Sequence, residues 1–350
     1  MYTQVTVPLD GSALAEAALI PAAALARRHH APVRVVSVGA SDREQVDLKT
    51  YHQALDEDGV LEAHWLAEVL TDDGPGVAGT IQSSLQGPAE LLCLATRGHG
   101  AVGTAVLGSV AEGVLARHPD PVLMVGPTFD PTQPLTFSTM VVCLDGSAGA
   151  EEVIPAARAW AKELGMCITL LHIAPPPAQP DAEVPPGREH DAEERDWEVQ
   201  AGRIAYLQRV AAGLAGEARL NWDIARSDNP AAAICRFAAT VPGAVVAIAA
   251  RATNGLRRLA LGSVAMQVAH GSPVPVLVVR SSQGPSSGPL EVVRSSSRCP
   301  SAPAGRPLQE GPIGPDDGDA SAAMLLDVRS SGAKEFAIAL HEAGARRGAE

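Results

Sequence analysis

Two short motifs, each present twice, contain the residues of this sequence that could do chemistry. Leu-Asp-Gly-Ser occurs at residues 9–12 and 144–147, and Gly-Ser-Val-Ala occurs at residues 108–111 and 262–265. A carboxylate repels phosphate, so the natural partners of the first motif are ribose hydroxyls, an adenine amino group or a backbone donor. A Gly-Ser pair at the start of a helix offers free N–H groups, a hydroxyl and the positive end of the helix dipole to a phosphate.

A glycine-rich segment precedes the first Gly-Ser pair. Residues 98–103 contain three glycines, and glycine lets backbone N–H groups approach an anion closely. The neighbouring Arg97 either adds a cationic contact to phosphate or points to solvent. Each motif alone is also explained by a tight turn or a helix cap. Their joint occurrence, twice and at corresponding positions, indicates nucleotide binding.

The elements that position these motifs follow from an internal repeat. Short apolar runs alternate with alanine-rich stretches, which is typical of βαβ units and of a parallel sheet covered by helices on both faces. We expect strands at residues 4–9, 33–38, 63–70, 91–96 and 122–125, and again at 139–144, 168–173, 219–225, 244–249 and 274–279. In such sheets, ligands bind beyond the carboxyl ends of the strands, where both motifs lie.

The repeat also predicts the domain organisation. We expect a first domain at residues 1–127, a linker at 128–136, a second domain at 137–281 and a largely disordered tail at 282–350. Residues 175–196, with six prolines and seven acidic residues, are expected to form an exposed, mobile loop. The last strand of each half is an apolar edge, so the halves should pair there about a pseudo-twofold axis.

The composition and the absence of several motifs exclude some classes of function. The net charge of −13 argues against a nucleic-acid or anionic-membrane surface, and no apolar stretch approaches the roughly 18–20 residues of a membrane span. The five cysteines show no metal-ligand spacing, which fits a reducing cytoplasm. His29-His30 favours a helix-end contact over a metal pair, and His172 favours a packed core position over a general base. GxxxxGK[ST], GxSxG and HExxH are absent, so we expect no catalytic residue and no metal site.

Both halves resemble domains of the universal stress protein (UspA) family. The family's nucleotide pattern is Gly-x2-Gly-x9-Gly followed by Ser or Thr. The first half has Ala95, Gly98, Gly108 and Ser109 at these positions, and the second half has Ala249, Ala252, Gly262 and Ser263. The resemblance implies two Rossmann-like domains of the adenine nucleotide alpha hydrolase type. Each would have five parallel strands in the order 3-2-1-4-5, and a subset of family members binds ATP.

The resemblance also implies site residues. In the first half, ATP would be held by Pro8, Asp10, Val38, Leu94, Ala95, Gly98, Gly108, Ser109 and Val110. A second site would comprise Asp145, Ile173, Gly262, Ser263 and Val264. Ala252 replaces a glycine there, and a Cβ in a left-handed conformation costs about 1–2 kcal/mol. ATP, with or without Mg²⁺, is therefore expected in the first half only.

These observations lead to one main hypothesis and two alternatives. We expect a cytoplasmic, ATP-binding regulator or sensor of the stress response without fast catalysis. A slow ATPase and a dimerisation module that binds no nucleotide remain as alternatives. A homodimer and a regulatory protein partner are left open, and the sequence does not indicate which stress or signal is involved.

Overall fold

A computed structural model describes residues 2–61, 65–97, 107–132, 135–176, 189–216, 218–251 and 262–281, with the backbone alone at 189–196 and 251. The first half contains β1 (Gln4–Pro8), α1 (Ala13–Glu16), α2 (Leu19–His29), β2 (Val33–Gly39), α3 (Asp42–Glu57), β3 (Leu66–Thr71), α4 (Val77–Ser84), β4 (Glu90–Ala95), α5 (Ser109–Arg117) and β5 (Val122–Val125). The second half contains β6 (Thr139–Cys143), α6 (Ala148–Glu151), α7 (Ile154–Leu164), β7 (Cys167–Ala174), α8 (Glu189–Leu214), β8 (Leu220–Arg226), α9 (Pro230–Thr240), β9 (Ala244–Arg251), α10 (Ser263–Gly271) and β10 (Val276–Ser281).

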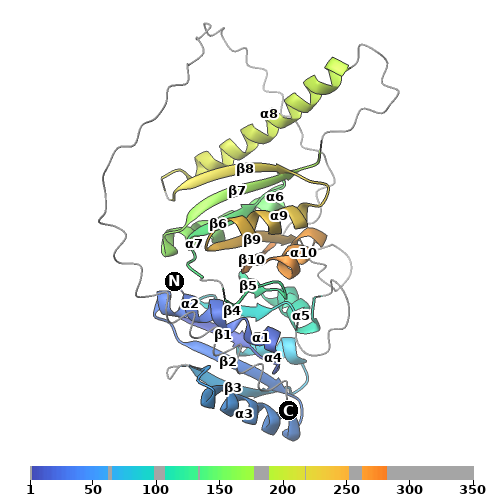
Figure 1. Cartoon of the computed structure of the whole chain (residues 1–350). Coiled ribbons are helices and arrows are strands. Elements are labelled where there is room, and N and C mark those ends of the chain that lie inside the picture. Colours follow the sequence, from blue (N-terminus) through green and yellow to red (C-terminus); the bar gives the residue numbers. More distant parts are fainter. Residues whose placement is uncertain are drawn as a thin grey trace, which may run out of the picture.

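All the strands belong to one ten-stranded sheet with the order β3-β2-β1-β4-β5-β10-β9-β6-β7-β8. Figure 1 shows them stacked from β3 at the bottom to β8 at the top. Within each half the strands are parallel, and both halves have the predicted order 3-2-1-4-5. The predicted Rossmann-like α/β fold is thus confirmed.

The two halves meet at β5 and β10, which pair antiparallel. Leu123 faces Leu277 at the centre of this pairing, flanked by Met124 with Val276 and Val122 with Val278. This register is symmetric about the central leucine pair, because Leu123 and Leu277 are both second in their strands. The pairing expected from the two apolar edge strands is present, and a pseudo-twofold axis passes through it.

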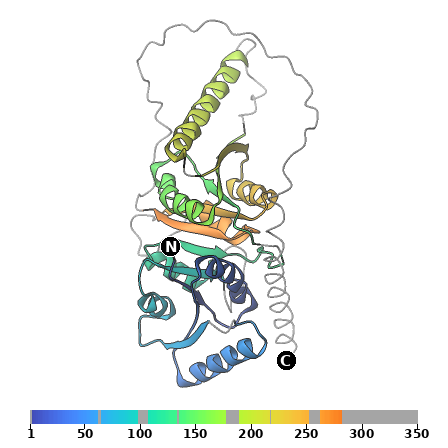
Figure 2. The ribbon, with the colours of Figure 1, turned by 90° about the vertical axis from the view of Figure 1, so that its left-hand side faces the viewer.

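Helices cover both faces of the sheet, as Figure 2 shows edge-on. One core cluster contains Leu19, Leu55 and Leu207 from α2, α3 and α8, together with residues of α7. The opposite cluster contains Ile81, Val114, Ile234 and Val268 from α4, α5, α9 and α10. Consecutive strand residues alternate between the two cores, as a strand buried on both faces requires.

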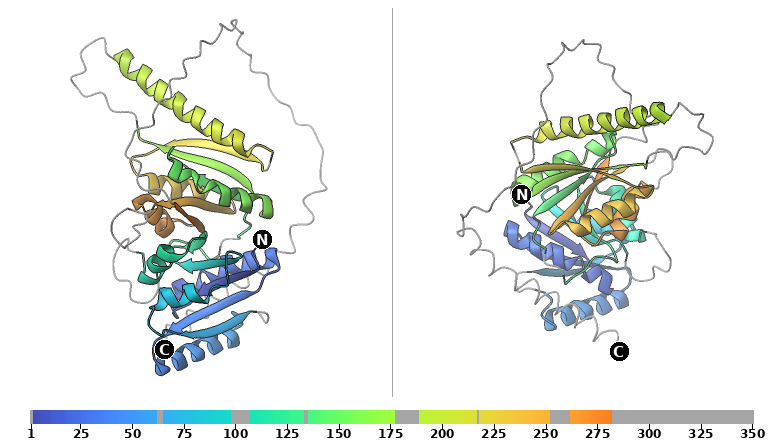
Figure 3. Two further views of the ribbon diagram at one scale, coloured as in Figure 1. Left: turned by 180° about the vertical axis from the view of Figure 1, so that it is seen from behind. Right: turned by 45° about the horizontal axis from the view of Figure 1, so that its top comes forward.

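One expectation about the second half is wrong in part. Residues 175–196 were expected to form a loop, but α8 begins at Glu189. The last proline of the segment is Pro186, and the residues after Gly187 are mostly good helix formers with acidic side chains that suit a helix N-terminus. Residues 177–188 lie outside the described residues, as do the predicted tail at 282–350 and residues 63–64 of the third predicted strand. Figure 3 shows the N-terminal end of α8 extending away from the sheet.

Within the described ranges, no helix is long and apolar enough to cross a membrane.

Candidate functional site

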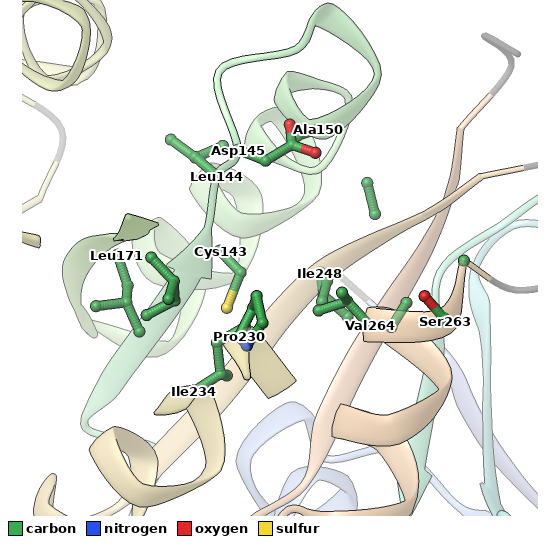
Figure 4. A pocket seen from close by; sticks show the side chains of 14 residues that line it. Cys143, Leu144, Asp145, Ala150, Leu171, Pro230, Ile234, Ile248, Ser263 and Val264 are labelled. Atoms are coloured by element: carbon green, nitrogen blue, oxygen red, sulfur yellow. The ribbon is translucent and has the colours of Figure 1, made fainter. Parts of the chain in front are cut away.

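A pocket lies at the carboxyl ends of β6, β7 and β9 in the second half (Figure 4). Its volume is about 250 Å³. Its lining residues are Cys143, Leu144, Asp145, Ala150, Leu171, Ile173, Pro230, Ile234, Ile248, Ala249, Gly262, Ser263, Val264 and Ala265. This position matches the general rule for ligand sites in open parallel sheets.

Asp145 is held at the rim of the pocket by its own local sequence. Its Oδ1 accepts hydrogen bonds from the backbone N–H of Ser147 at 3.0 Å and from the Ser147 hydroxyl at 2.6 Å. Gly146 adopts a φ of 88°, which a residue with a side chain rarely adopts. The Ser147 Oγ in turn caps α6 by accepting from the N–H of Ala150 at 3.2 Å. The Asp-Gly-Ser motif therefore fixes a carboxylate at the end of β6.

The N-terminus of α10 forms the opposite side of the pocket. Gly262 is its N-cap residue and, among the described residues, provides no side-chain hydrogen bond to the first turn. The first-turn N–H groups, the helix dipole and the Ser263 hydroxyl therefore suit an anion or a hydrogen-bond acceptor. In Figure 4, Asp145 and Ser263 come from different sides, with Ile248 between them and Val264 next to Ser263.

The remaining wall of the pocket consists of apolar side chains and the uncharged thiol of Cys143. Burial raises the pKa of the Cys143 thiol well above its usual range, so the thiol stays protonated. Burial also lowers the pKa of His172, whose Nδ1 lies 2.9 Å from the carbonyl oxygen of Leu144. His172 is 6% exposed, as expected for a packed core histidine. The Cys143 thiol therefore lacks the ionisation needed of a nucleophile at neutral pH. His172 is a neutral imidazole packed beside the Leu144 carbonyl, and it is not among the residues that line the pocket.

The structure brings together all the residues predicted for the second site. Asp145, Ile173, Gly262, Ser263 and Val264 all line the pocket. Sequence reasoning missed nine lining residues, namely Cys143, Leu144, Ala150, Leu171, Pro230, Ile234, Ile248, Ala249 and Ala265. The repeat held a signal for three of them. Cys143 stands where the first half has Pro8, and Ile248 and Ala249 stand where it has Leu94 and Ala95.

The first half repeats the motif geometry. Asp10 Oδ1 accepts from the Ser12 N–H at 3.0 Å and from the Ser12 hydroxyl at 2.6 Å, and Gly11 has a φ of 82°. Pro8 ends β1 and Ala95 ends the adjacent β4. Asp10 and Asp145 thus have the same local role, and each supports a helix cap as well as presenting a carboxylate.

The other predicted first-half residues lie around the end of β4. Gly108 is the N-cap of α5, with Ser109 as the first helical residue, and the Gly108 N–H donates to Thr96 O at 2.8 Å. Leu94 belongs to one apolar cluster, against which Val38 and Val110 pack. Gly98 and the rest of residues 98–106 lie outside the described residues.

Among the described residues, no group of three or more His, Cys, Asp and Glu side chains could hold a metal ion.

Comparison with known proteins identifies the family. The sequence model of the universal stress protein family matches residues 1–126 and again residues 136–280. The chain belongs to this family. Its two family domains correspond to the two halves of the sheet that meet at β5 and β10.

Relatives from two mycobacteria are also universal stress proteins. Mb2028c of Mycobacterium bovis and Rv2005c of Mycobacterium tuberculosis are each 27% identical to this universal stress protein over 201 residues, or 55% of the chain. The matched region spans 63% of the length of these relatives.

Solved structures show the same fold. A universal stress protein from Archaeoglobus fulgidus matches with a TM-score of 0.50 and 20% identity, covering 80% of this chain and 99% of that one. The functionally unknown protein PA1789 from Pseudomonas aeruginosa matches with a TM-score of 0.51 and 16% identity, covering 80% and 93%.

Proposed function

We propose that the protein binds an adenine nucleotide and acts as a cytoplasmic, nucleotide-responsive regulator in the stress response, without fast catalysis. The observation that carries the proposal is the second-half pocket, where Asp145, an apolar wall and the open N-terminus of α10 converge. The first half contains the same motif at Asp10 and the same Gly108-Ser109 helix start.

The lining residues fit the parts of a nucleotide. Apolar side chains such as Ile173 and Ile248 suit the faces of a base. The carboxylate of Asp145 suits donors, such as ribose hydroxyls, and the first-turn N–H groups of α10 suit a phosphate. A volume of about 250 Å³ is small for ligand pockets, which commonly span about 300–1,000 Å³, so it suits the adenosine moiety better than a whole triphosphate.

We assign ATP, with or without Mg²⁺, to the first half. Its sequence keeps Gly98, and Arg97 offers a cation at the start of the same loop. The second half has Ala252 in place of that glycine, so its phosphate contacts should be weaker. The difference between the sites would then lie in phosphate contact rather than in recognition of adenosine.

Calorimetric titration with ATP tests the proposal. We expect one strong site per chain. Gly98→Val should abolish this site, whereas Ala252→Gly should retain it and should strengthen binding at the second site. Two equal sites in the unmodified chain, or an unchanged first site in Gly98→Val, would contradict the assignment. Absence of any binding would overturn the proposal itself.

One observation favours a second candidate, an interaction module that binds no nucleotide. Asp10 and Asp145 each accept two hydrogen bonds that complete a turn and support a helix cap. Such a role explains both motifs without a ligand. Mass spectrometry of nucleotides released from the purified protein distinguishes the candidates, because the module should release none.

A further inference from the structure

Unlike residues of the two halves meet beside the β5–β10 pairing. The two domains are equivalent in fold, so each could in principle pair with a copy of itself about a true twofold axis. Three contacts beside the β5–β10 pairing differ at pseudo-equivalent positions. For each of the three, the contact on one side of the pseudo-twofold axis uses different residue types from the equivalent contact on the other side.

The first contact joins the start of the first half to α7 of the second half. The Trp160 indole N–H donates to the Tyr2 hydroxyl at 2.9 Å, and the two rings meet edge-on with centroids 6.0 Å apart. The positions equivalent to these residues are Leu25 and Phe137, which are both buried in the same apolar cluster. Two first halves would place Tyr2 against Leu25, and two second halves would place Phe137 against Trp160. Either pair would leave a polar group without this partner, which is costly when it is buried.

The second contact joins the C-terminal ends of α2 and α7. Arg28 donates to the carbonyl oxygen of Leu164 at 2.8 Å, and His29 Nδ1 lies 3.0 Å from Glu163 Oε1. Arg28 and Glu163 are each the tenth residue of an eleven-residue helix, so they occupy equivalent positions. Two first halves would place Arg28 beside His29 without the Glu163 carboxylate, whereas two second halves would place each Glu163 carboxylate against the Leu164 carbonyl oxygen of the other copy. Both arrangements lose the donor–acceptor pairing of the unlike halves, and the second sets two oxygen acceptors against each other.

The third contact depends on the sizes of the residues that meet. Arg280 Nη1 donates to the carbonyl oxygen of Ala116 at 3.3 Å. At the pseudo-equivalent contact, Gly126 lies so close to His270 that a Cβ on this glycine would overlap the His270 carbonyl oxygen. A large residue therefore meets a small one on each side of the axis. Two second halves would place Arg280 against His270, and two first halves would place Gly126 against Ala116 and leave a gap.

We propose that these three contacts make the interdomain surface specific for the opposite half of the chain. A first half binds a second half, from its own chain or by domain exchange from another copy, and excludes a like half. This specificity lies in the pairing surface and does not depend on nucleotide binding. The unlike residues at the axis thereby have a role in partner choice, beyond any part they play in stability.

A chain that can be cut after folding tests this directly. A protease site is inserted after the exposed Thr132 of the linker, and the folded protein is cleaved, unfolded in urea, refolded and weighed by native mass spectrometry. Mixed pairs are expected in more than about tenfold excess over random pairing, a difference of about 1.4 kcal/mol. Like pairs at the random ratio would overturn the proposal. So would the recovery of no pairs, because the contacts would then be insufficient without the covalent link.

A variant of the same chain separates specificity from simple stability. Glu163→Arg places a donor at the position equivalent to Arg28, so two second halves could each donate to the Leu164 carbonyl of the other. The excess of mixed pairs should fall and pairs of second halves should appear. The matched control, Glu57→Arg at an exposed position of α3 in the first half, should leave the ratio unchanged. A fall in yield with an unchanged ratio would show that Glu163 contributes to stability alone and would contradict its assigned role.

Discussion

At the scale of single residues, local sequence determined most of what could be predicted about the site. Asp-Gly-Ser implies a turn with a left-handed glycine and a serine cap, and both copies adopt that geometry. Pro230 and Ile234 could not be assigned to the pocket in the same way. They belong to α9, and their place in the pocket depends on how that helix packs against the sheet rather than on a motif.

The carboxylate of Asp145 should serve both the turn and the ligand, and two substitutions separate these roles. Asp145→Ala removes the acceptor for Ser147, so both stability and binding of adenosine to the second half should fall, each by about 1–3 kcal/mol. Asp145→Asn keeps an oxygen acceptor and should retain most of the stability while weakening ligand binding. Urea unfolding and calorimetry measure the two effects. Equal binding by all three proteins would show that the carboxylate acts on the turn alone.

Gly243 is a residue whose substitution should be costly for steric reasons. Its φ is +62°, and a Cβ there would overlap Thr136 Oγ1. Gly243→Ala should therefore destabilise the protein by about 1–3 kcal/mol or more. Gly202→Ala is the matched control, since that glycine lies inside α8 with open space around it. The control should raise stability by up to about 1 kcal/mol, measured by chemical denaturation. A similar loss in both variants would contradict the steric explanation.

At the scale of elements, α8 shows where sequence patterns mislead. Six prolines in the preceding segment suggested a loop through residue 196, but helix formation resumes at Glu189 once the prolines end. The C-terminal half of α8 packs on the sheet through Leu207, Val210 and Leu214. Trp197, nearer its N-terminal end, is 72% exposed. The packed half therefore anchors the helix.

This division predicts unequal effects of alanine substitutions along α8. Leu207 is fully buried in the core, so Leu207→Ala should cost about 2–5 kcal/mol of stability. The neighbouring Gln208 is exposed, and Gln208→Ala should change stability by less than about 0.5 kcal/mol. Urea midpoints of the two variants provide the comparison. If Leu207→Ala were as stable as Gln208→Ala, the packing of α8 on this core would be wrong.

At the scale of the whole molecule, the repeat predicted two equivalent domains joined through their last strands, because edge strands with apolar residues require a partner. It could not predict which unlike residues meet across the axis. Contacts such as Trp160 with Tyr2 depend on the relative placement of domains that are distant in sequence. Long-range packing of this kind leaves no local pattern.

Buried histidines in both halves should make the folded protein less stable in mild acid. Burial is the main cause that lowers the pKa values of His29, His52, His118, His172 and His270. In the unfolded chain, histidine titrates near pH 6.5, so the unfolded state binds more protons than the folded state below this pH. By linkage, stability is fully present above about pH 6.5 and falls as the pH drops toward the lowered folded-state values.

Urea midpoints measured between about pH 7.5 and about pH 5.5 test this prediction, since carboxylates dominate only at lower pH. His52 is a suitable residue for a variant, because burial lowers its pKa and its ring lies 2.9 Å from the Ser37 hydroxyl. His52→Gln removes one titrating group and can still bond with that hydroxyl, so the slope of stability against pH should decrease. A flat profile in the unmodified protein, or an unchanged slope in His52→Gln, would contradict the expected effect of buried neutral histidines.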